Sequence, residues 1–280
     1  MVLGQGSTRG MARSLPQHLA FHDGPTPIES ASLKGVILAG GTGSRLFPLT
    51  RITNKHLLPV YDRPMISYGI EALVKAGVNE LMLVTGGTHA GEFLRLLGNG
   101  HEHGVERLQY AYQEKAGGIA EALGLSERFV AGEPVVVMLA DNILERSLRP
   151  AVSNFAAQQG GARILLSRVD DAAHLRHLGV PEFDAEGRRL VRIVEKPEVP
   201  PSSFAVTGIY FYPPEVFSVI PTLQPSGRGE LEITDVNNHF VQAGCMDYDV
   251  LDGFWGDAGE SIEAYHAVND FVRAHGANKD

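Results

Sequence analysis

The apolar run Val36–Ala39 leads directly into a glycine-rich turn, Gly40–Gly43, and Arg45 follows that turn. Glycine has no Cβ and tolerates positive φ, so a turn of this kind lets backbone N–H groups come close to an anion. Arg45 adds a permanent positive charge beside the turn, and Lys55 adds another ten residues later. The pattern predicts a strand that ends in a cradle for a polyphosphate.

Two common phosphate-binding motifs do not fit this turn. A P-loop needs a Gly-Lys-Ser or Gly-Lys-Thr ending, which is absent, and a dinucleotide fingerprint needs a third glycine where Leu46 stands. An ordinary tight connection between a strand and a helix would explain one or two glycines. It does not explain the whole glycine cluster together with Arg45.

The composition narrows the class of protein. Of the 280 residues, 44% are hydrophobic and 20% are charged, which is typical of a globular protein with a large core. The 33 acidic and 24 basic residues give a net charge of −9, so we expect neither a nucleic-acid surface nor an anionic-membrane surface. No apolar run is long enough to cross a bilayer. The single Cys245 excludes an internal disulfide and fits a reducing compartment, so we expect a cytoplasmic protein.

The chain changes character after its first 33 residues. Residues 1–33 lack sustained periodicity and the apolar core of a secretory signal, so we expect a flexible N-terminal extension or an expression remnant. From residue 34 on, short β-branched runs alternate with helical patterns such as Met65–Lys75 and Ile119–Phe129. This alternation predicts an α/β fold with a Rossmann-like, mixed but mostly parallel sheet flanked by helices.

The second half of the chain is richer in strand patterns. Four runs predict strands, and Asp184–Gly187 predicts a hairpin turn between two of them, since Gly187 is free to take positive φ. We therefore expect a smaller β-rich lobe that covers the first and carries a second substrate. The predicted strands are Arg163–Val169, Gly179–Asp184, Leu190–Glu195 and Ala205–Tyr212.

Two aspartates are candidate metal ligands. Asp141 closes the apolar strand pattern Val135–Ala140, and Asp257 lies on a glycine-flanked turn after a strand. Mg²⁺ prefers one or two carboxylates together with phosphate oxygens, and such an ion would neutralise a triphosphate. The alternative for Asp141 is an Asx turn or a helix cap.

Other motifs are weaker when taken alone. Gln113 offers a donor and an acceptor to a pyrimidine edge, although its loop also fits a plain strand-to-helix connection. Lys196 and Arg228 could bind a sugar phosphate, or they could be solvated and helix-flanking charges. His101 and His103 have a His-x-His spacing, but their glycine-rich surroundings favour a solvated loop over a metal site.

Taken together, these segments resemble the sugar-1-phosphate nucleotidyltransferases, most closely the glucose-1-phosphate thymidylyltransferase branch of that family. The resemblance covers nearly everything from residue 34 to about 272, with the order and spacing of uncommon strings in agreement. The matching segments are Leu38–Leu46, Lys55–Met65, Gln113–Ala122, Leu139–Asn142, Gly179–Asp184, Glu195–Pro197, Ala205–Tyr212, Arg228–Asp235 and Trp255–Asp257.

The resemblance implies the transfer of a nucleoside monophosphate from an NTP, with dTTP favoured, to a sugar 1-phosphate, with glucose 1-phosphate favoured. It implies four catalytic residues, Arg45, Lys55, Asp141 and Asp257, of which the two aspartates would bind Mg²⁺. The nucleotide would contact Leu38, Gly40, Gly41, Thr42, Gly43, Ser44, Gln113 and Gly118. The sugar phosphate would contact Gly179, Glu195, Lys196, Val206 and Arg228.

The resemblance also implies a domain organisation and an assembly. A nucleotide lobe would span about 34–160, a sugar-binding lobe about 161–245, and a metal turn with a helix 246–272, followed by a tail at 273–280. We expect a homo-oligomer, either a dimer or a tetramer.

Several positions depart from the family pattern in the base and sugar pockets. Leu178 replaces a tyrosine, the loop Gln113–Gly118 replaces Gln-Pro-Ser-Pro-Asp-Gly, and Trp255–Gly259 reads Trp-Gly-Asp-Ala-Gly in place of Trp-Leu-Asp-Thr-Gly. The chain also ends soon after Arg273, which bears on feedback regulation. The alternatives are a uridylyl- or cytidylyltransferase for another phosphorylated sugar, a non-catalytic sugar-nucleotide-binding regulatory protein and, less favoured, a glycosyltransferase.

Overall fold

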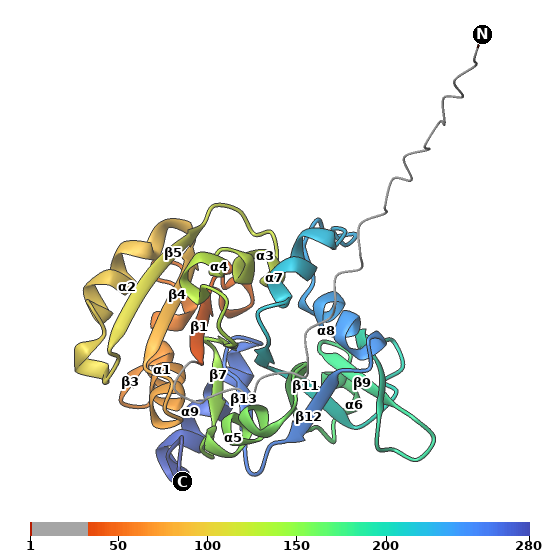
Figure 1. Cartoon of the computed structure of the whole chain (residues 1–280). Helices are drawn as coiled ribbons and strands as arrows, with labels where there is room; N and C mark the ends of the chain where they lie inside the picture. Colours follow the sequence, from red (N-terminus) through yellow and green to blue (C-terminus); the bar gives the residue numbers. More distant parts are fainter. Residues whose placement is uncertain (2–32) are drawn as a thin grey trace.

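A seven-stranded sheet forms the centre of the computed structural model, which describes Met1 and residues 33–280. The strand order is β12-β8-β11-β6-β1-β4-β5, and Figure 1 shows the sheet running from β5 on one side to β12 on the other. Apart from Met1 and Leu33, the extension predicted for residues 1–33 lies outside the described residues. The strands of this sheet are β1 (Lys34–Ala39), β4 (Glu80–Gly86), β5 (Arg107–Gln113), β6 (Val135–Leu139), β8 (Ala162–Arg168), β11 (Phe204–Tyr212) and β12 (Met246–Val250).

The pairing directions make this a mixed sheet that is mostly parallel. β1 pairs in parallel with β4 and β6, β4 with β5, and β8 with β12, whereas β11 is antiparallel to both β6 and β8. The predicted fold class, a mostly parallel sheet flanked by helices, is confirmed. Three antiparallel pairs stand apart from it: β2 (Pro59–Val60) with β3 (Arg63–Pro64), β7 (Asn142–Leu144) with β13 (Trp255–Asp257), and β9 (Gly179–Phe183) with β10 (Leu190–Glu195).

Helices connect most of these strands. The α-helices are α1 (Met65–Lys75), α2 (Ala90–Leu97), α3 (Ile119–Gly124), α4 (Glu127–Val130), α5 (Arg149–Ala157), α6 (Ala172–Leu175), α7 (Val216–Val219), α8 (Ile233–Gln242) and α9 (Ile262–His275). Short 3-10 helices cover Ser44–Leu46, Lys55–Leu57, Gly87–His89, His101–His103 and Ile220–Thr222. No helix within residues 33–280 combines the length and the apolar character that crossing a membrane would need.

The single helix predicted over Ile119–Phe129 is wrong, because the segment divides into α3 and α4. The break follows Gly124, a residue that weakens helices. Ser126 then donates its hydroxyl to the carbonyl of Leu123 at 2.6 Å, and its amide to the same carbonyl at 2.9 Å. Such local bonds of serine compete with the regular helical ladder.

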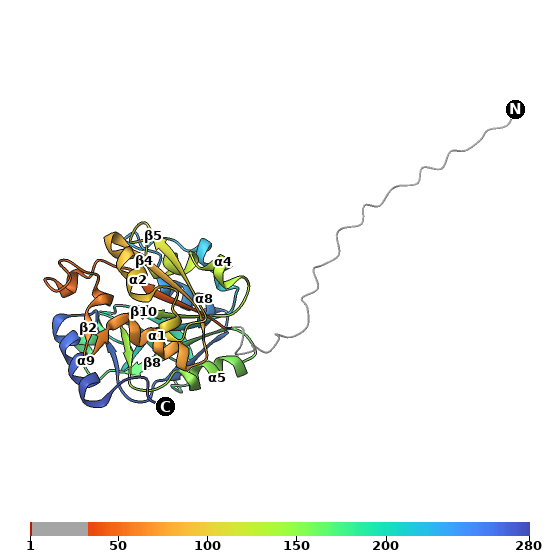
Figure 2. The same ribbon diagram turned by 90° about the vertical axis from the view of Figure 1, so that its left-hand side faces the viewer.

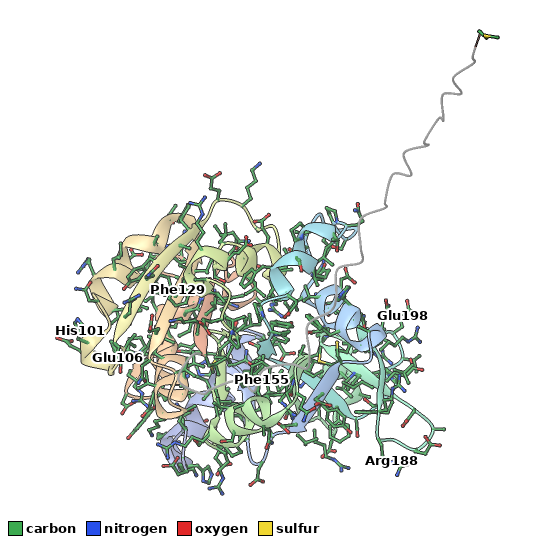
Figure 3. All side chains as sticks on the ribbon, viewed as in Figure 1. His101, Glu106, Phe129, Phe155, Arg188 and Glu198 are labelled. Carbon is green, nitrogen blue, oxygen red and sulfur yellow. The ribbon has the colours of Figure 1, made fainter. Side chains whose placement is uncertain are left out.

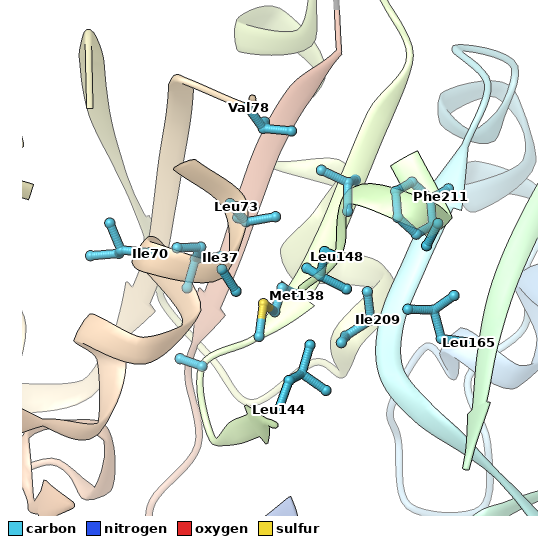
Figure 4. Packing of buried hydrophobic residues seen from close by; sticks show 14 of the residues in the cluster. Ile37, Ile70, Leu73, Val78, Met138, Leu144, Leu148, Leu165, Ile209 and Phe211 are labelled. Atoms are coloured by element: carbon cyan, nitrogen blue, oxygen red, sulfur yellow. The ribbon is translucent and has the colours of Figure 1, made fainter. Parts of the chain in front are cut away.

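The core lies on both faces of the sheet, because alternate residues of each central strand point to opposite sides. Ile37 of β1 packs with α1 and α5 on one face, whereas Val36 packs with α3 and α8 on the other. Figure 4 shows the first of these clusters, which extends from Leu73 of α1 past Met138 of β6 to Phe211 of β11. Burying each large side chain of this kind stabilises the fold by about 1.5–3 kcal/mol.

The predicted hairpin turn at Asp184–Gly187 is confirmed between β9 and β10. The Gly187 amide donates to the carbonyl of Asp184 at 2.9 Å, and Gly187 takes a φ of +69°. The Asp184 carboxylate also accepts from the amides of Arg188 and Arg189. Arg188 lies at the far end of this hairpin, away from the central sheet (Figure 3).

A third apolar cluster joins α9 to the segment that follows β1. It contains Leu46 from the turn region, Val60 from β2, and Tyr265 and Val268 from α9. Figure 2 shows the segment between β1 and β2 extending away from the sheet on the side of α9. This packing fixes the base of the glycine-rich turn, because Leu46 is fully buried.

Candidate active site

One cleft of about 700 Å³ opens where β1 and β6 end. Residues from both halves of the chain line it, and they include nearly all of the candidate site residues. The candidates that line it are Leu38, Gly40, Gly41, Ser44, Arg45, Lys55, Gln113, Gly118, Asp141, Gly179, Glu195, Lys196, Val206, Arg228 and Asp257. Thr42 and Gly43 belong to the same turn but do not line the cleft.

The glycine-rich turn takes the backbone conformation expected of it. Gly41 and Gly43 have φ values of +90° and +63°, which side-chain-bearing residues rarely adopt. Thr50 closes the turn from behind by donating its hydroxyl to the carbonyl of Gly43 at 2.8 Å. Arg45, in the 3-10 helix that follows, is exposed and carries its charge to the edge of the cleft.

Lys55 and Asp141 form a nearly buried ion pair in the cleft. Lys55 Nζ lies 2.5 Å from Asp141 Oδ2, and only 12% and 7% of the two side chains are exposed. Burial alone would lower the pKa of Lys55, but the carboxylates of Asp141 and Asp257 outweigh burial and raise it. Burial would likewise raise the pKa of Asp141, but Lys55 and the neighbouring His56 hold it well below its usual range. Both groups are therefore charged at neutral pH.

The β7–β13 pair brings Asp257 beside Asp141. Asp257 is opposite Asn142 in this pair, and the Ala258 amide donates to the main-chain oxygen of Asp141 at 2.9 Å. Burial and the charge of Asp141 raise the pKa of Asp257 to about 7. The raised pKa means that the surrounding positive charges and hydrogen bonds do not fully stabilise the ionised Asp257 carboxylate. A cation bound here would therefore stabilise that carboxylate.

The carboxylate oxygens of the two aspartates are of the type that Mg²⁺ takes as ligands. Among residues 33–280, no group of three or more His, Cys, Asp or Glu side chains is arranged to hold a metal ion. Mg²⁺ needs no such group, because it keeps several waters and takes its other ligands from phosphates. His101 and His103 lie in a short 3-10 helix and do not line the cleft. Figure 3 shows His101 at the outer edge of the molecule.

Asn142 is a structural member of the site that sequence reasoning did not single out. Its side-chain oxygen accepts from Trp255 Nε1 at 2.6 Å and from the Gly208 amide at 3.0 Å. Its side-chain nitrogen donates to Asp141 Oδ1 at 3.2 Å. One amide therefore ties β13, β11 and the Asp141 carboxylate together, a role that follows only from the fold.

His56 is a second residue that sequence reasoning missed. It is 2% exposed, its Nδ1 lies 2.8 Å from Asn54 Oδ1, and its Nε2 lies 3.8 Å from Asp141 Oδ2. Burial lowers the pKa of His56, so the ring is neutral at neutral pH. Its position directly after Lys55 was the only signal in the sequence.

Gln113 lies at the end of β5 and lines the cleft. Its side-chain nitrogen donates to the Gly118 carbonyl at 3.2 Å and to Glu121 Oε1 at 2.9 Å. The expectation that Gln113 offers both a donor and an acceptor to a base is therefore revised. The side-chain nitrogen is used by the Gly118 carbonyl and by Glu121 of α3, which leaves Oε1 to accept from a ligand.

Lys196 and Glu195 share one side of the cleft because Lys196 has a φ of +46°. Regular strand geometry would send their side chains to opposite faces. Glu195 accepts from the Thr234 hydroxyl at 2.6 Å, and Lys196 Nζ lies 3.4 Å from Glu195 Oε1. A left-handed conformation in a side-chain-bearing residue is uncommon and is found at functional sites.

Arg228 completes this side of the cleft. Its Nη2 donates to both oxygens of Glu232, at 2.9 and 3.0 Å, and lies 3.8 Å from Glu195 Oε1. These carboxylates hold the guanidinium at the cleft and raise the pKa of Arg228 against the effect of burial. Lys196 and Arg228 thus line the same cleft as Arg45 and Lys55, with their charges paired to Glu195 and Glu232.

Comparisons with known proteins identify relatives of this chain. The family model described as nucleotidyl transferase matches residues 34–275. A glucose-1-phosphate thymidylyltransferase of Actinoplanes sp. SE50/110 is 44% identical over 245 residues, which are 86% of this chain and 78% of that protein. One from Neisseria gonorrhoeae is 41% identical over 244 residues, covering 86% and 83% of the two chains.

A solved structure gives the same result. The crystal structure of a candidate glucose-1-phosphate thymidylyltransferase from Bacillus anthracis, in complex with sucrose, is 47% identical to this chain. The superposition has a TM-score of 0.80 and covers 86% of this chain and 95% of that one. With a family model that spans most of the chain and relatives above 40% identity, this chain belongs to the nucleotidyl transferase family.

Proposed function

We propose that this protein transfers a nucleoside monophosphate from an NTP to a sugar 1-phosphate and releases pyrophosphate. The observation that carries the proposal is the cleft that joins Lys55, Asp141 and Asp257 to the turn of Arg45 and to the Glu195–Lys196 side. We favour dTTP and glucose 1-phosphate as substrates, because the relatives from Actinoplanes and Neisseria gonorrhoeae carry the name glucose-1-phosphate thymidylyltransferase.

The reaction needs positioning and charge neutralisation more than proton transfer. A sugar phosphate oxygen is already an anion, so it can attack the α-phosphorus of the NTP in line without a general base. The bond from the α-phosphorus to the bridging oxygen then breaks, and pyrophosphate leaves. Lys196 and Arg228 would hold the sugar phosphate, while Arg45 and Lys55 would stabilise the charge on the triphosphate.

Asp141 and Asp257 are the residues we propose for Mg²⁺. When bound there, Mg²⁺ would neutralise charge on the triphosphate and polarise the α-phosphate. The raised pKa of Asp257 supports a cation at this position, because a nearby positive charge stabilises the ionised carboxylate.

Pyrophosphate release from a grid of substrates tests the proposal. The grid pairs dTTP, UTP and CTP with several sugar 1-phosphates, each with Mg²⁺ or with EDTA. We expect the highest kcat/KM for dTTP with glucose 1-phosphate and no turnover in EDTA. If no pair releases pyrophosphate although sugar nucleotides bind, the protein is a regulatory binding protein and the proposed activity is wrong.

A further inference from the structure

Gln113 is nearly buried in the wall of the cleft, and its side-chain amide bonds to the loop that follows β5. It is 9% exposed, and both Gln113 and Gly40 line the cleft. Gln113 Oε1 lies 3.3 Å from the position that a Cβ on Gly40 would occupy. The carbonyl oxygen of the amide is therefore on the side of Gly40, and the nitrogen is on the side of the loop.

Glu121, in the first turn of α3, holds this orientation together with the Gly118 carbonyl. Its Oε1 accepts from Gln113 Nε2 at 2.9 Å, and the Gly118 carbonyl accepts from the same nitrogen at 3.2 Å. An ionised carboxylate has no hydrogen to donate, so a reversed Gln113 amide would place oxygen against oxygen at both contacts. A hydrogen bond to a charged group is also stronger than one between neutral groups.

The loop is built to admit this carboxylate. A Cβ on Gly117 would overlap the carboxyl group of Glu121, so glycine at 117 is what allows the contact. The loop is anchored on its other side, since the Leu231 amide donates to the Gly117 carbonyl at 2.8 Å and the Ala120 amide to the Leu231 carbonyl at 3.2 Å. The loop and the amide it holds are thus fixed before a ligand binds.

We infer that Glu121 is a positioning residue that makes Gln113 a hydrogen-bond acceptor toward the nucleobase and so selects thymine and uracil over cytosine. The inference rests on the proposed function, because it names the base class taken by that same cleft. Thymine and uracil carry an N–H at ring position 3, which can donate to Gln113 Oε1. Cytosine carries a lone pair at that position, which would face the oxygen unfavourably.

Glu121→Gln tests the inference with almost no change in size. The new side chain can donate as well as accept, so only the Gly118 carbonyl still favours the present orientation of the Gln113 amide. We expect the ratio of the dCTP Kd to the dTTP Kd to fall on the order of tenfold, with the KM for sugar 1-phosphate unchanged. Calorimetric titration with the magnesium complexes of the two nucleotides, without sugar phosphate, measures this ratio.

Gly117→Ala is a second variant that should break the contact between Glu121 and Gln113. Its Cβ would displace the flexible end of Glu121 while leaving the Glu121 side chain in the sequence. We expect the same fall in the Kd ratio. Glu127→Gln is the matched control, because Glu127 is exposed on α4 and its substitution removes the same charge without touching Gln113.

The outcomes separate this inference from the proposed function. An unchanged Kd ratio in both variants, or an equal loss of affinity for both nucleotides, overturns the role of Glu121. The Kd ratio is measured without turnover, so it remains decisive even if no substrate pair releases pyrophosphate. Conversely, an active enzyme with an unchanged ratio in the variants keeps the proposed function and removes the inference.

Discussion

Lys55 Nζ donates to Asp141 Oδ2 across 2.5 Å, although 86 positions of sequence separate the two residues. Asp257 faces the same ammonium, so one buried cation is set beside two carboxylates. Removing one member of a buried pair leaves its partner uncompensated, which is costly. Substituting either residue of the pair is therefore expected to affect both the charge at the base of the cleft and the stability of the fold.

Asp141→Asn is expected to remove most of the activity while the fold persists, because the Asp257 carboxylate still faces the Lys55 ammonium. The variant loses the charge that opposes Lys55 and one of the two carboxylates proposed for Mg²⁺. We expect kcat for pyrophosphate release to fall by about 100-fold or more, the scale of losing one group that stabilises transition-state charge. Circular dichroism checks the fold, and near-normal kcat would remove Asp141 from the metal role.

Gly259→Ala probes the same pair without changing a charged group. A Cβ at this position would lie 2.5 Å from Asp141 Oδ2 and 2.7 Å from Lys55 Nζ. We expect the pair to be displaced and kcat to fall by about 100-fold, because small misplacements at a reacting centre are expensive. Gly91→Ala is the control, since a Cβ there meets nothing within 4 Å and alanine favours helix α2. Equal kcat in the two variants would contradict this prediction.

The amino-acid pattern was sufficient to predict the sheet and the end of it at which the cleft lies. Polar residues that follow buried parallel strands meet at one edge, so the strand pattern by itself places Asp141 together with the glycine-rich turn. The proximity of Asp257 could not be derived from spacing, because it depends on the short β7–β13 pair between distant segments. The sequence indicated Asp257 as a second metal-ligand candidate only through its glycine-flanked turn and the resemblance to a family.

Local backbone and amide geometry were the other parts that could not be predicted from the sequence. Lys196 adopts a positive φ that normally marks glycine or asparagine, so nothing in its residue type predicts it. The orientation of Gln113 depends on Glu121, eight positions away on the next helix. Likewise, the break between α3 and α4 depends on the hydrogen bond that the Ser126 hydroxyl donates to the Leu123 carbonyl.

Asn142→Ala is expected to destabilise the fold through unpaired donors. The Trp255 indole N–H and the Gly208 amide both donate to Asn142 Oδ1 in the buried interior. Leaving two buried donors without an acceptor should lower the free energy of unfolding by about 3 kcal/mol. Urea denaturation measures this. Asn154→Ala is the control, because its bond to Asp249 is exposed and should be worth little. A loss no larger than that of the control would contradict the prediction.

Asp257→Asn should stabilise the metal-free protein at about pH 8. Burial and the Asp141 charge raise the folded-state pKa of Asp257 to about 7, from an ordinary value of 3.8. The folded state therefore binds this proton more tightly, so the contribution of Asp257 to stability is fully present below about pH 4 and is lost as the pH rises through about 7. At about pH 8 the ionised carboxylate opposes folding, and its removal should raise Tm by about 5 °C, with a smaller rise near pH 5.5. Thermal unfolding in EDTA at both pH values, with the exposed Asp252→Asn as control, measures the difference. A Tm that falls at about pH 8, or a rise in Tm that does not depend on pH, would show that folding does not raise the pKa of Asp257.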